Sequence, residues 1–247
     1  MTIDFHVHSK ITSKFPFNKE EFLLIIEEAR LEGIDSLVLT EHCHADEFIG
    51  AYDFLSNNYP LIEDYYDVDG IKIFCGIEIT TNQNYDFLVI GKPNEVLELR
   101  NTIVNELKYT KDIPIEKLFK LFDKEKFIII LSHPHREHDE IDLSDEILNK
   151  LDAIEYNARE LYDGGIDIMK NRIDKLSKET DLPIVCGGDA HHFIRMGCVR
   201  NIFDSDCITV KQIKEQINLR NFKTEISPNL SIRVKSSIVI KKLMCNK

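Results

Sequence analysis

The sequence predicts an α/β fold in which the strands close into a distorted TIM-like (β/α)7 barrel. Segments with strand-like and helix-like patterns alternate along the chain, which favours a parallel sheet with helical crossovers. The strand segments are almost purely apolar, as expected for strands that are buried on both faces. Polar clusters follow several different strands, and a closed barrel brings such strand ends into one ring, whereas an open sheet gathers only a few of them.

The expected strands are short apolar runs rich in branched residues. The first alternates between polar and apolar residues, and the run that precedes His133 is almost purely apolar. In chain order the expected strands are Thr2–Val7, Ile34–Leu39, Ile71–Ile79, Phe87–Ile90, Phe127–Leu131, Ala153–Tyr156 and Pro183–Cys186.

The expected helices have amphipathic patterns and identifiable ends. Asn18 precedes acidic residues and caps the amphipathic run Phe22–Leu31, which Gly33 ends. Pro114 suits the first turn of a helix over Pro114–Phe122. The pattern from Leu230 onwards is ambiguous. The other expected helices are Asn94–Leu107, Ile166–Lys178 and Thr209–Asn218.

The bulk composition limits the function classes. A length of 247 residues and a hydrophobic content of 43% suit one domain over residues 1–247. No apolar run is long enough to cross a bilayer, and the first residues lack the basic start and apolar stretch of a signal peptide. We therefore expect a cytoplasmic protein with no membrane partner. The net charge of −12 has the wrong sign for binding along a nucleic-acid backbone, so we expect no extended nucleic acid as a partner.

All nine histidines lie in four short clusters, and each cluster follows an apolar run. Imidazole and carboxylate groups are the ligands that borderline and harder divalent cations accept. The pattern therefore predicts a metal site that holds more than one ion. The histidines are His6 and His8, His42 and His44, His133, His135 and His138, and His191 and His192.

Strand geometry supports this interpretation. His6 and His8 lie two residues apart on a strand, so their side chains face the same way. Asp189 and His191 have the same spacing. His133 ends an apolar strand, where a polar ring costs free energy unless it is paired. The alternatives are a chance surface motif at His6 and His8, and a core histidine bonded to a backbone carbonyl at His133.

The motifs together resemble the PHP (polymerase and histidinol phosphatase) domain from Ile3 to about Gly197. They are His6-x-His8, Glu41-His42, Gly76-x-Glu78, Ser132-His133-Pro134 and Gly188-Asp189-Ala190-His191. The resemblance implies a distorted seven-stranded barrel that holds two or three divalent ions, usually zinc, manganese or iron. It also implies hydrolysis of phosphate monoesters. The metal ligands that it implies are His6, His8, His42, Glu78, His133, Asp189 and His191.

The chain departs from the family pattern in three places, one of which is Glu41, where relatives usually carry Asp before the second-motif histidine. Many relatives have a further His or Asp shortly after the first motif, but the stretch Ser9–Lys14 contains neither. Many also have a His at the end of the strand that here leads into Lys92. A third ion would then need a substitute such as Asp86, His44 or His135, or the Lys92 ammonium would replace it.

These features predict a metal-dependent hydrolase of small phosphomonoesters. Two cations would lower the pKa of a bridging water to about 7, and the resulting hydroxide would attack phosphorus. We expect His191 or His135 to donate a proton to the leaving alkoxide. Arg136 and Arg195, in loops at the expected barrel mouth, would bind the phosphate, with Arg159 as a third candidate. The alternative for each arginine is a solvated surface charge.

Other functions remain open at this point. One is histidinol-phosphate phosphatase specifically, and another is a different metal-dependent hydrolase such as an amidohydrolase. A third is a non-catalytic metal-binding module that serves a partner protein. Exonuclease action on a polynucleotide is the least favoured because of the acidic charge balance.

Overall fold

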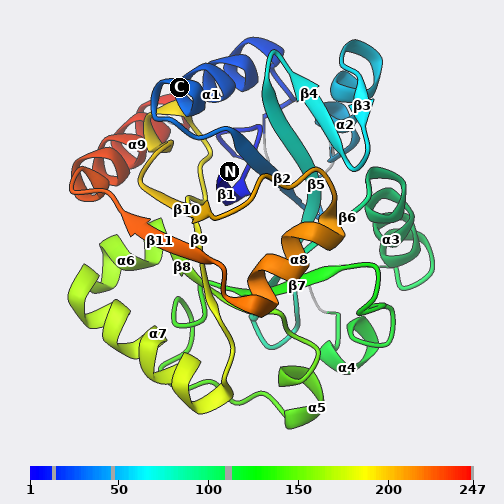
Figure 1. Cartoon of the computed structure of the whole chain (residues 1–247), viewed down its shortest axis with the longest axis vertical. Helices are drawn as coiled ribbons and strands as arrows, with labels where there is room; N and C mark the ends of the chain where they lie inside the picture. Colours follow the sequence, from blue (N-terminus) through cyan, green and yellow to red (C-terminus); the bar gives the residue numbers. More distant parts are fainter. Residues whose placement is uncertain (13–14, 46–47, 109–112, 246–247) are drawn as a thin grey trace.

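The computed structural model describes residues 1–12, 15–45, 48–108 and 113–245. One sheet winds through these residues into a nearly closed barrel, and helices lie around its outer face (Figure 1). The predicted α/β fold of a distorted TIM-like barrel is therefore confirmed. The extent of the domain over residues 1–247 stays a prediction.

The strands follow the order β11-β10-β1-β2-β5-β6-β7-β8-β9, and β4 pairs with both β3 and β5 off this path. Each expected strand is present, and β3, β4, β10 and β11 are additional. The bounds are β1 Thr2–Val7, β2 Ser36–His42, β3 Leu61–Ile62, β4 Tyr65–Val68, β5 Ile71–Thr80, β6 Asp86–Gly91, β7 Ile128–Ser132, β8 Ala153–Asn157, β9 Ile184–Gly187, β10 Val199–Phe203 and β11 Phe222–Ile226.

The sheet is only partly parallel, which differs from the expectation. The pairs β1–β2, β2–β5, β7–β8 and β8–β9 are parallel, whereas β6 is antiparallel to both β5 and β7. The reason is the connection over residues 81–85, because a parallel crossover needs about a dozen residues or more. Asn84 in this turn has a φ of 58°, a left-handed conformation that asparagine tolerates better than most residues.

The barrel closes at a seam where β1, β9 and β10 meet. Val7 forms a parallel bridge to Ala190, and the His8 N–H donates to the Ala190 carbonyl over 2.9 Å. The Asn201 side chain of β10 accepts from the Cys186 N–H at 2.7 Å. Its amide also donates to the carbonyls of Ile3 and Cys186, both at 2.9 Å. One buried side chain thus connects three strands at this seam.

The helices cover the barrel, and their ends follow the sequence signals. Asn18 accepts from the N–H groups of Glu20 and Glu21 at the start of α1, and Thr209 and Gln212 form a capping box at α8. The ambiguous segment from Leu230 is a helix. None of the helices in the described part of the chain is long and apolar enough to cross a bilayer. The bounds are α1 Lys19–Leu31, α2 Phe48–Asn58, α3 Pro93–Asn105, α4 Ile115–Leu118, α5 Asp145–Leu148, α6 Ala158–Gly164, α7 Ile166–Thr180, the 3-10 helix η1 Phe193–Arg195, α8 Val210–Leu219 and α9 Leu230–Cys245.

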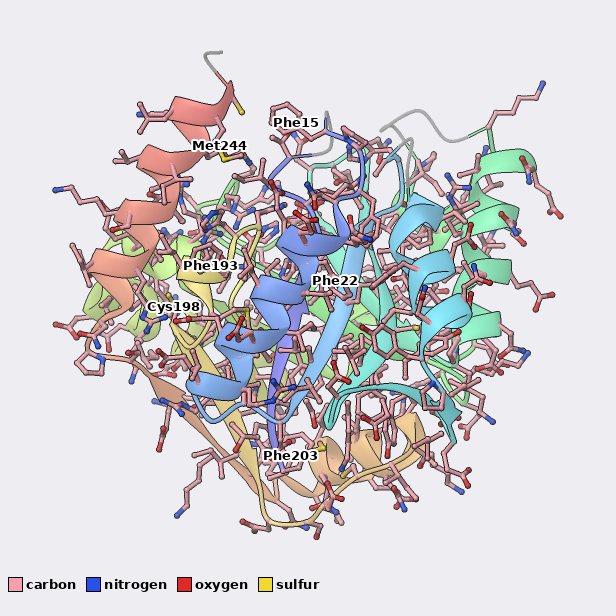
Figure 2. The ribbon with its side chains drawn as sticks, turned by 90° about the horizontal axis from the view of Figure 1, so that it is seen from above. Phe15, Phe22, Phe193, Cys198, Phe203 and Met244 are labelled. Atoms are coloured by element: carbon pink, nitrogen blue, oxygen red, sulfur yellow. The ribbon has the colours of Figure 1, made fainter. Side chains whose placement is uncertain are left out.

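Apolar side chains fill the barrel at one end. Phe5 and Phe74 of the strands belong to the same buried cluster as Ile213 and Ile217 of α8, which lies across the barrel in Figure 1. Figure 2 shows α8 near Phe203 at the lower end, where β1 begins, and β1 runs from there towards the opposite end. The carboxyl ends of β1 and its parallel neighbours therefore point away from the apolar plug.

Candidate metal centre

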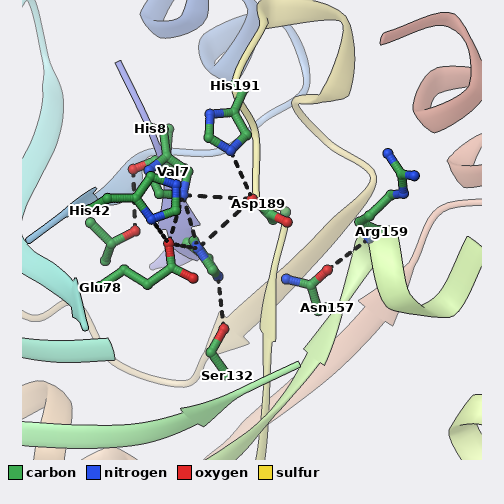
Figure 3. A network of polar contacts seen from close by, with 12 residues as sticks. Val7, His8, His42, Glu78, Ser132, Asn157, Arg159, Asp189 and His191 are labelled. Atoms are coloured by element: carbon green, nitrogen blue, oxygen red, sulfur yellow. Dashed lines mark hydrogen bonds and ion pairs between the residues drawn. The ribbon is translucent and has the colours of Figure 1, made fainter. Parts of the chain in front are cut away.

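The imidazole and carboxylate side chains selected from the sequence meet at the carboxyl-terminal end of the barrel. They come from β1, β2, β5, the end of β7 and the loop after β9 (Figure 3). Parallel strands bring such positions together because their carboxyl ends share one rim. The structure brings together His6, His8, His42, Glu78, His133, Asp189 and His191.

Glu78 lies at the centre of this group. Its Oε2 is 2.7 Å from His42 Nδ1 and 3.4 Å from His8 Nε2, and its Oε1 is 3.1 Å from His133 Nε2. Burial of the carboxyl raises its pKa, but the nearby charges of His42 and His6 outweigh this effect and hold the pKa well below its usual range. Glu78 therefore stays ionised in the barrel.

Asp189 is the second carboxylate of the group. Its Oδ1 is 3.3 Å from His191 Nε2 and 3.6 Å from His8 Nε2, and its Oδ2 accepts from Arg136 Nη2 at 2.7 Å. Burial alone would raise the pKa of this carboxyl, but Arg136 and the histidines lower it well below its usual range. One oxygen thus faces the histidines while the other faces a guanidinium.

The side chains form three groups whose ligand atoms lie within 4.8 Å of one another. Asp86, considered above as a substitute ligand, belongs to one of them. Among the buried polar atoms in this part of the chain, His8 Nδ1 has no hydrogen-bond partner among the described residues. This donor set fits borderline divalent cations. The groups are His8, His42 and His191; His6, His8 and Asp189; and Glu78, Asp86 and His133.

Glu155 of β8 is a residue that the sequence analysis missed. It is fully buried, and its Oε1 accepts from His6 Nδ1 at 2.8 Å. Its Oε2 accepts from Ser132 Oγ at 2.6 Å and from the His133 N–H at 2.9 Å. A proton on Nδ1 leaves the Nε2 lone pair of His6 free, 3.0 Å from His8 Nε2. The sequence feature that could have identified Glu155 is its position as a carboxylate in the middle of the apolar run Ala153–Tyr156.

Two further contacts orient the groups at the seam. Asp4 Oδ1 accepts from the N–H groups of His6 and Gly188 at 3.0 and 2.8 Å, and burial raises the pKa of Asp4 to about 7. The ring of His191 donates from Nδ1 to the Lys10 carbonyl at 2.8 Å. With the proton on Nδ1, the lone pair of His191 is on Nε2, the nitrogen that faces Asp189.

The backbone is strained at two of these positions. His133 and Asp189 have φ values of 30° and 49°, which non-glycine residues seldom adopt. Such strain persists only where the surrounding contacts enforce it, and it clusters at functional sites. At His133, the hydrogen bond from the backbone N–H to Glu155 Oε2 helps to hold this conformation.

The two expected phosphate-binding arginines lie in different environments. The Arg136 side chain is 32% exposed and bonds Asp189 and, at 3.1 Å, Asn157 Oδ1. Arg195 is only 5% exposed. Its Nε donates to Ser237 Oγ of α9 at 3.2 Å, and its Nη1 donates to the Asp189 carbonyl. Arg195 therefore connects α9 to the loop that carries Asp189, whereas Arg136 remains accessible.

Other residues that the sequence singled out lie apart from the three groups. His135 Nδ1 lies 3.2 Å from the His138 carbonyl and 3.3 Å from Arg172 Nη2, and His135 and Arg172 line a separate cavity of about 350 Å³. Lys92 is exposed, with its Nζ 4.0 Å from Asp64 Oδ1. Within the stretch Ser9–Lys14, residues 13 and 14 lie outside the described part of the chain.

Comparison with known proteins identifies the fold. No protein-family model matches the sequence, and no curated protein does. The solved structure of PsfC from Pseudomonas syringae PB-5123 is similar over 98% of both chains, with a TM-score of 0.77 and 19% sequence identity. The lesion-specific endonuclease PfuEndoQ from Pyrococcus furiosus is similar with a TM-score of 0.67 and 19% identity. The match covers 91% of this chain but 58% of the endonuclease, so this chain spans little more than half of it.

A third solved structure corrects one expectation. It is endonuclease Q in complex with a 27-mer duplex that has an abasic lesion at the active site, and it matches 91% of this chain with a TM-score of 0.65 and 17% identity. The exclusion of extended nucleic acid as a partner is therefore wrong. Net charge is a sum over the whole surface, whereas binding depends on the local potential. Here Arg136 and Arg195 lie beside the candidate metal centre despite a net charge of −12.

Proposed function

We propose that this chain is a metal-dependent phosphoesterase that hydrolyses small phosphomonoesters. The observation that carries the proposal is the ring of imidazoles around Glu78 and Asp189, next to a guanidinium that remains accessible to solvent. A phosphate ester requires both elements, because its oxygens need positive charge and the planar guanidinium of Arg136 can donate hydrogen bonds to two of them.

The proposed metal ligands are those that the sequence selects, with Asp86 as a further carboxylate. Divalent ions at these positions would supply positive charge that polarises a phosphoryl group and makes water more acidic. The ligands would be His6, His8, His42, Glu78, Asp86, His133, Asp189 and His191. Zinc, manganese and iron all suit such a set of imidazoles and carboxylates.

The remaining roles belong to the protein's own groups. Glu155 holds the His6 ring in one tautomer, and the Lys10 carbonyl does the same for His191. This arrangement suits His191 as a ligand rather than as the acid that protonates the leaving group. Arg136 would bind an oxygen of the phosphoryl group while it keeps its bond to Asp189, since a guanidinium has five N–H donors.

The test is a turnover assay with the purified protein. Manganese or zinc would be added with a panel of phosphomonoesters that includes histidinol phosphate, and phosphate release would be measured. We expect metal-dependent release from at least one ester, and loss of both release and bound metal in the double variant His6→Ala, His8→Ala. Lys92→Ala is the matched control on an exposed residue. Well-occupied metal without turnover of any ester would favour a non-catalytic metal-binding module.

A second candidate is cleavage of phosphodiester bonds in DNA. The observation that favours it is the fold shared with endonuclease Q, which has been seen with duplex DNA at its active site. The same panel should therefore contain a duplex with an abasic site. It should also contain an amide and a lactone, because turnover of these would indicate an amidohydrolase-type reaction instead.

A further inference from the structure

We infer that Lys241 of α9 and Arg159 of α6 form an anion subsite beside the metal centre that binds a second phosphate group of the substrate. This inference rests on the proposed function, because it assigns the substrate class of the same site. We call Lys241 and Arg159 the outer cation pair, in contrast to Arg136, which bonds Asp189 directly.

The position of Lys241 follows from the way α9 docks. Ser237 of α9 is buried and accepts from Arg195, which in turn donates to the Asp189 carbonyl. Lys241 lies four residues later, so it shares the helix face of Ser237 and lies about 6 Å farther along the axis. Figure 2 shows α9 running towards the same end of the molecule as β1, with Met244 close to that end. Lys241 therefore lies at the rim, beyond the ring of ligands.

Arg159 approaches the rim from α6. Its backbone N–H donates to Asn157 Oδ1 at 2.9 Å, the same oxygen that accepts from Arg136. In Figure 3, Arg159 lies beyond Asp189 as seen from Glu78. Its Nε pairs with Asp163 Oδ2, a half-exposed partner on the same helix. Surface pairs of this kind contribute little, so the guanidinium remains available to a ligand.

Basic groups gather on this side of the site. Arg136 and Arg195 pair with Asp189, and the Lys241 ammonium feels the charges of Asp189, Arg195 and Arg159. Lys241 is accessible to solvent and has no ion pair among the described residues. Partial burial and the neighbouring Arg195 and Arg159 lower the pKa of Lys241, although Asp189 opposes them. Like charges held together in this way attract an anion.

A second phosphate fits this arrangement better than the reacting one. The reacting phosphoryl group must lie among the ligands of Glu78 and Asp189, where Arg136 is the accessible cation. Lys241 lies one helical turn beyond Ser237, whose partner Arg195 donates to the Asp189 carbonyl, so the outer cation pair is placed to meet a neighbouring phosphate of the same molecule. Such a phosphate belongs either to a small bisphosphate or to a nucleic-acid strand.

The experiment compares Lys241→Gln with Lys242→Gln, since Lys242 is exposed and points about 100° away on the same helix. Substrates are a hexose monophosphate, the matching hexose bisphosphate and a 5′-phosphorylated oligonucleotide. We expect Lys241→Gln to raise KM for one of the two-phosphate substrates about tenfold more than KM for the monophosphate, with a smaller effect on kcat. Lys241→Arg should restore most of the difference. The substrate that responds identifies the source of the second phosphate.

Failure of the proposed function can be told apart from failure of this inference. If no ester is turned over, calorimetry with pyrophosphate and with inorganic phosphate replaces the kinetic readout. Pyrophosphate binding that Lys241→Gln weakens about tenfold, and that Lys242→Gln leaves unchanged, supports the subsite. Equal effects of the two substitutions, or no pyrophosphate binding by the wild-type protein, overturn it.

Discussion

Replacing Glu155 with Gln tests the organisation of the metal centre with the smallest change in shape. Glu155 accepts hydrogen bonds from His6 Nδ1, Ser132 Oγ and the His133 N–H. An amide has only one acceptor oxygen, so its NH2 group must face either His6 or the donors to the other oxygen, which also include Asn157 Nδ2 at 3.2 Å. If the NH2 group faces His6, the ring must accept at Nδ1 and carry its proton on Nε2. His6 would then lose the lone pair that faces His8.

The expected loss follows from these contacts. Removing an outer partner of a metal-bound histidine lowers metal affinity about 10- to 100-fold, which corresponds to about 1.4–2.7 kcal/mol. The free energy that one hydrogen bond to a charged group contributes, about 1.5–3 kcal/mol, agrees with this range. The effect should therefore be much smaller than loss of a ligand but well outside measurement error.

The assay is a competition titration of zinc or manganese monitored by calorimetry. Glu160→Gln is the matched control, because Glu160 is also buried and accepts from a backbone N–H, that of His135. We expect the control to bind metal like the wild-type protein. An affinity of folded Glu155→Gln within about twofold of the wild-type value would refute the reasoning, since the tautomer of His6 would then not depend on Glu155.

Three further predictions concern stability. A methyl group at Gly187 would collide with the Glu155 carboxylate and the His6 Cβ, so Gly187→Ala should lower the melting temperature by several degrees; an unchanged value would contradict this packing. Asn201→Ala removes three buried hydrogen bonds at the seam and should cost about 2–4 kcal/mol in urea unfolding, whereas a loss below about 0.5 kcal/mol would count against the seam. Burial raises the pKa of Glu160 from 4.5 to about 7, so the folded state holds its proton more tightly and stability should fall between these pH values. Glu160→Gln should remove up to about 3 kcal/mol of this decline, and identical pH profiles would disprove the assignment.

Local sequence signals were sufficient for much of the fold. Asn18, the amphipathic run after it and Gly33 define α1 because a cap, a buried face and a stop are all local features. β10 and β11 were not predicted, although Val199, Asn201 and Phe203 alternate with partly exposed residues as a half-buried strand should. Their place beside β1 depends on contacts between distant parts of the chain.

The candidate ligands could be predicted because strand ends in a barrel must converge, but their partners could not. Whether Glu155 reaches His6 depends on how β8 and β1 are arranged across the barrel, and no single strand encodes this. Arg195 illustrates the same limit. Its position after the Asp189 motif is compatible with a solvated loop, and the contacts that hold its side chain inward, to Ser237 of α9 and to the Asp189 carbonyl, depend on the tertiary structure.

The seam has a consequence for how the protein is made. His8 on one edge and Ala190 on the other are joined directly, and His191 contacts Lys10, which is 181 positions earlier in the chain. A ribosome must therefore synthesise most of the polypeptide before the early and late residues of the candidate metal centre can meet. Any chemistry performed there would be absent from every nascent or truncated product that stops short of this point.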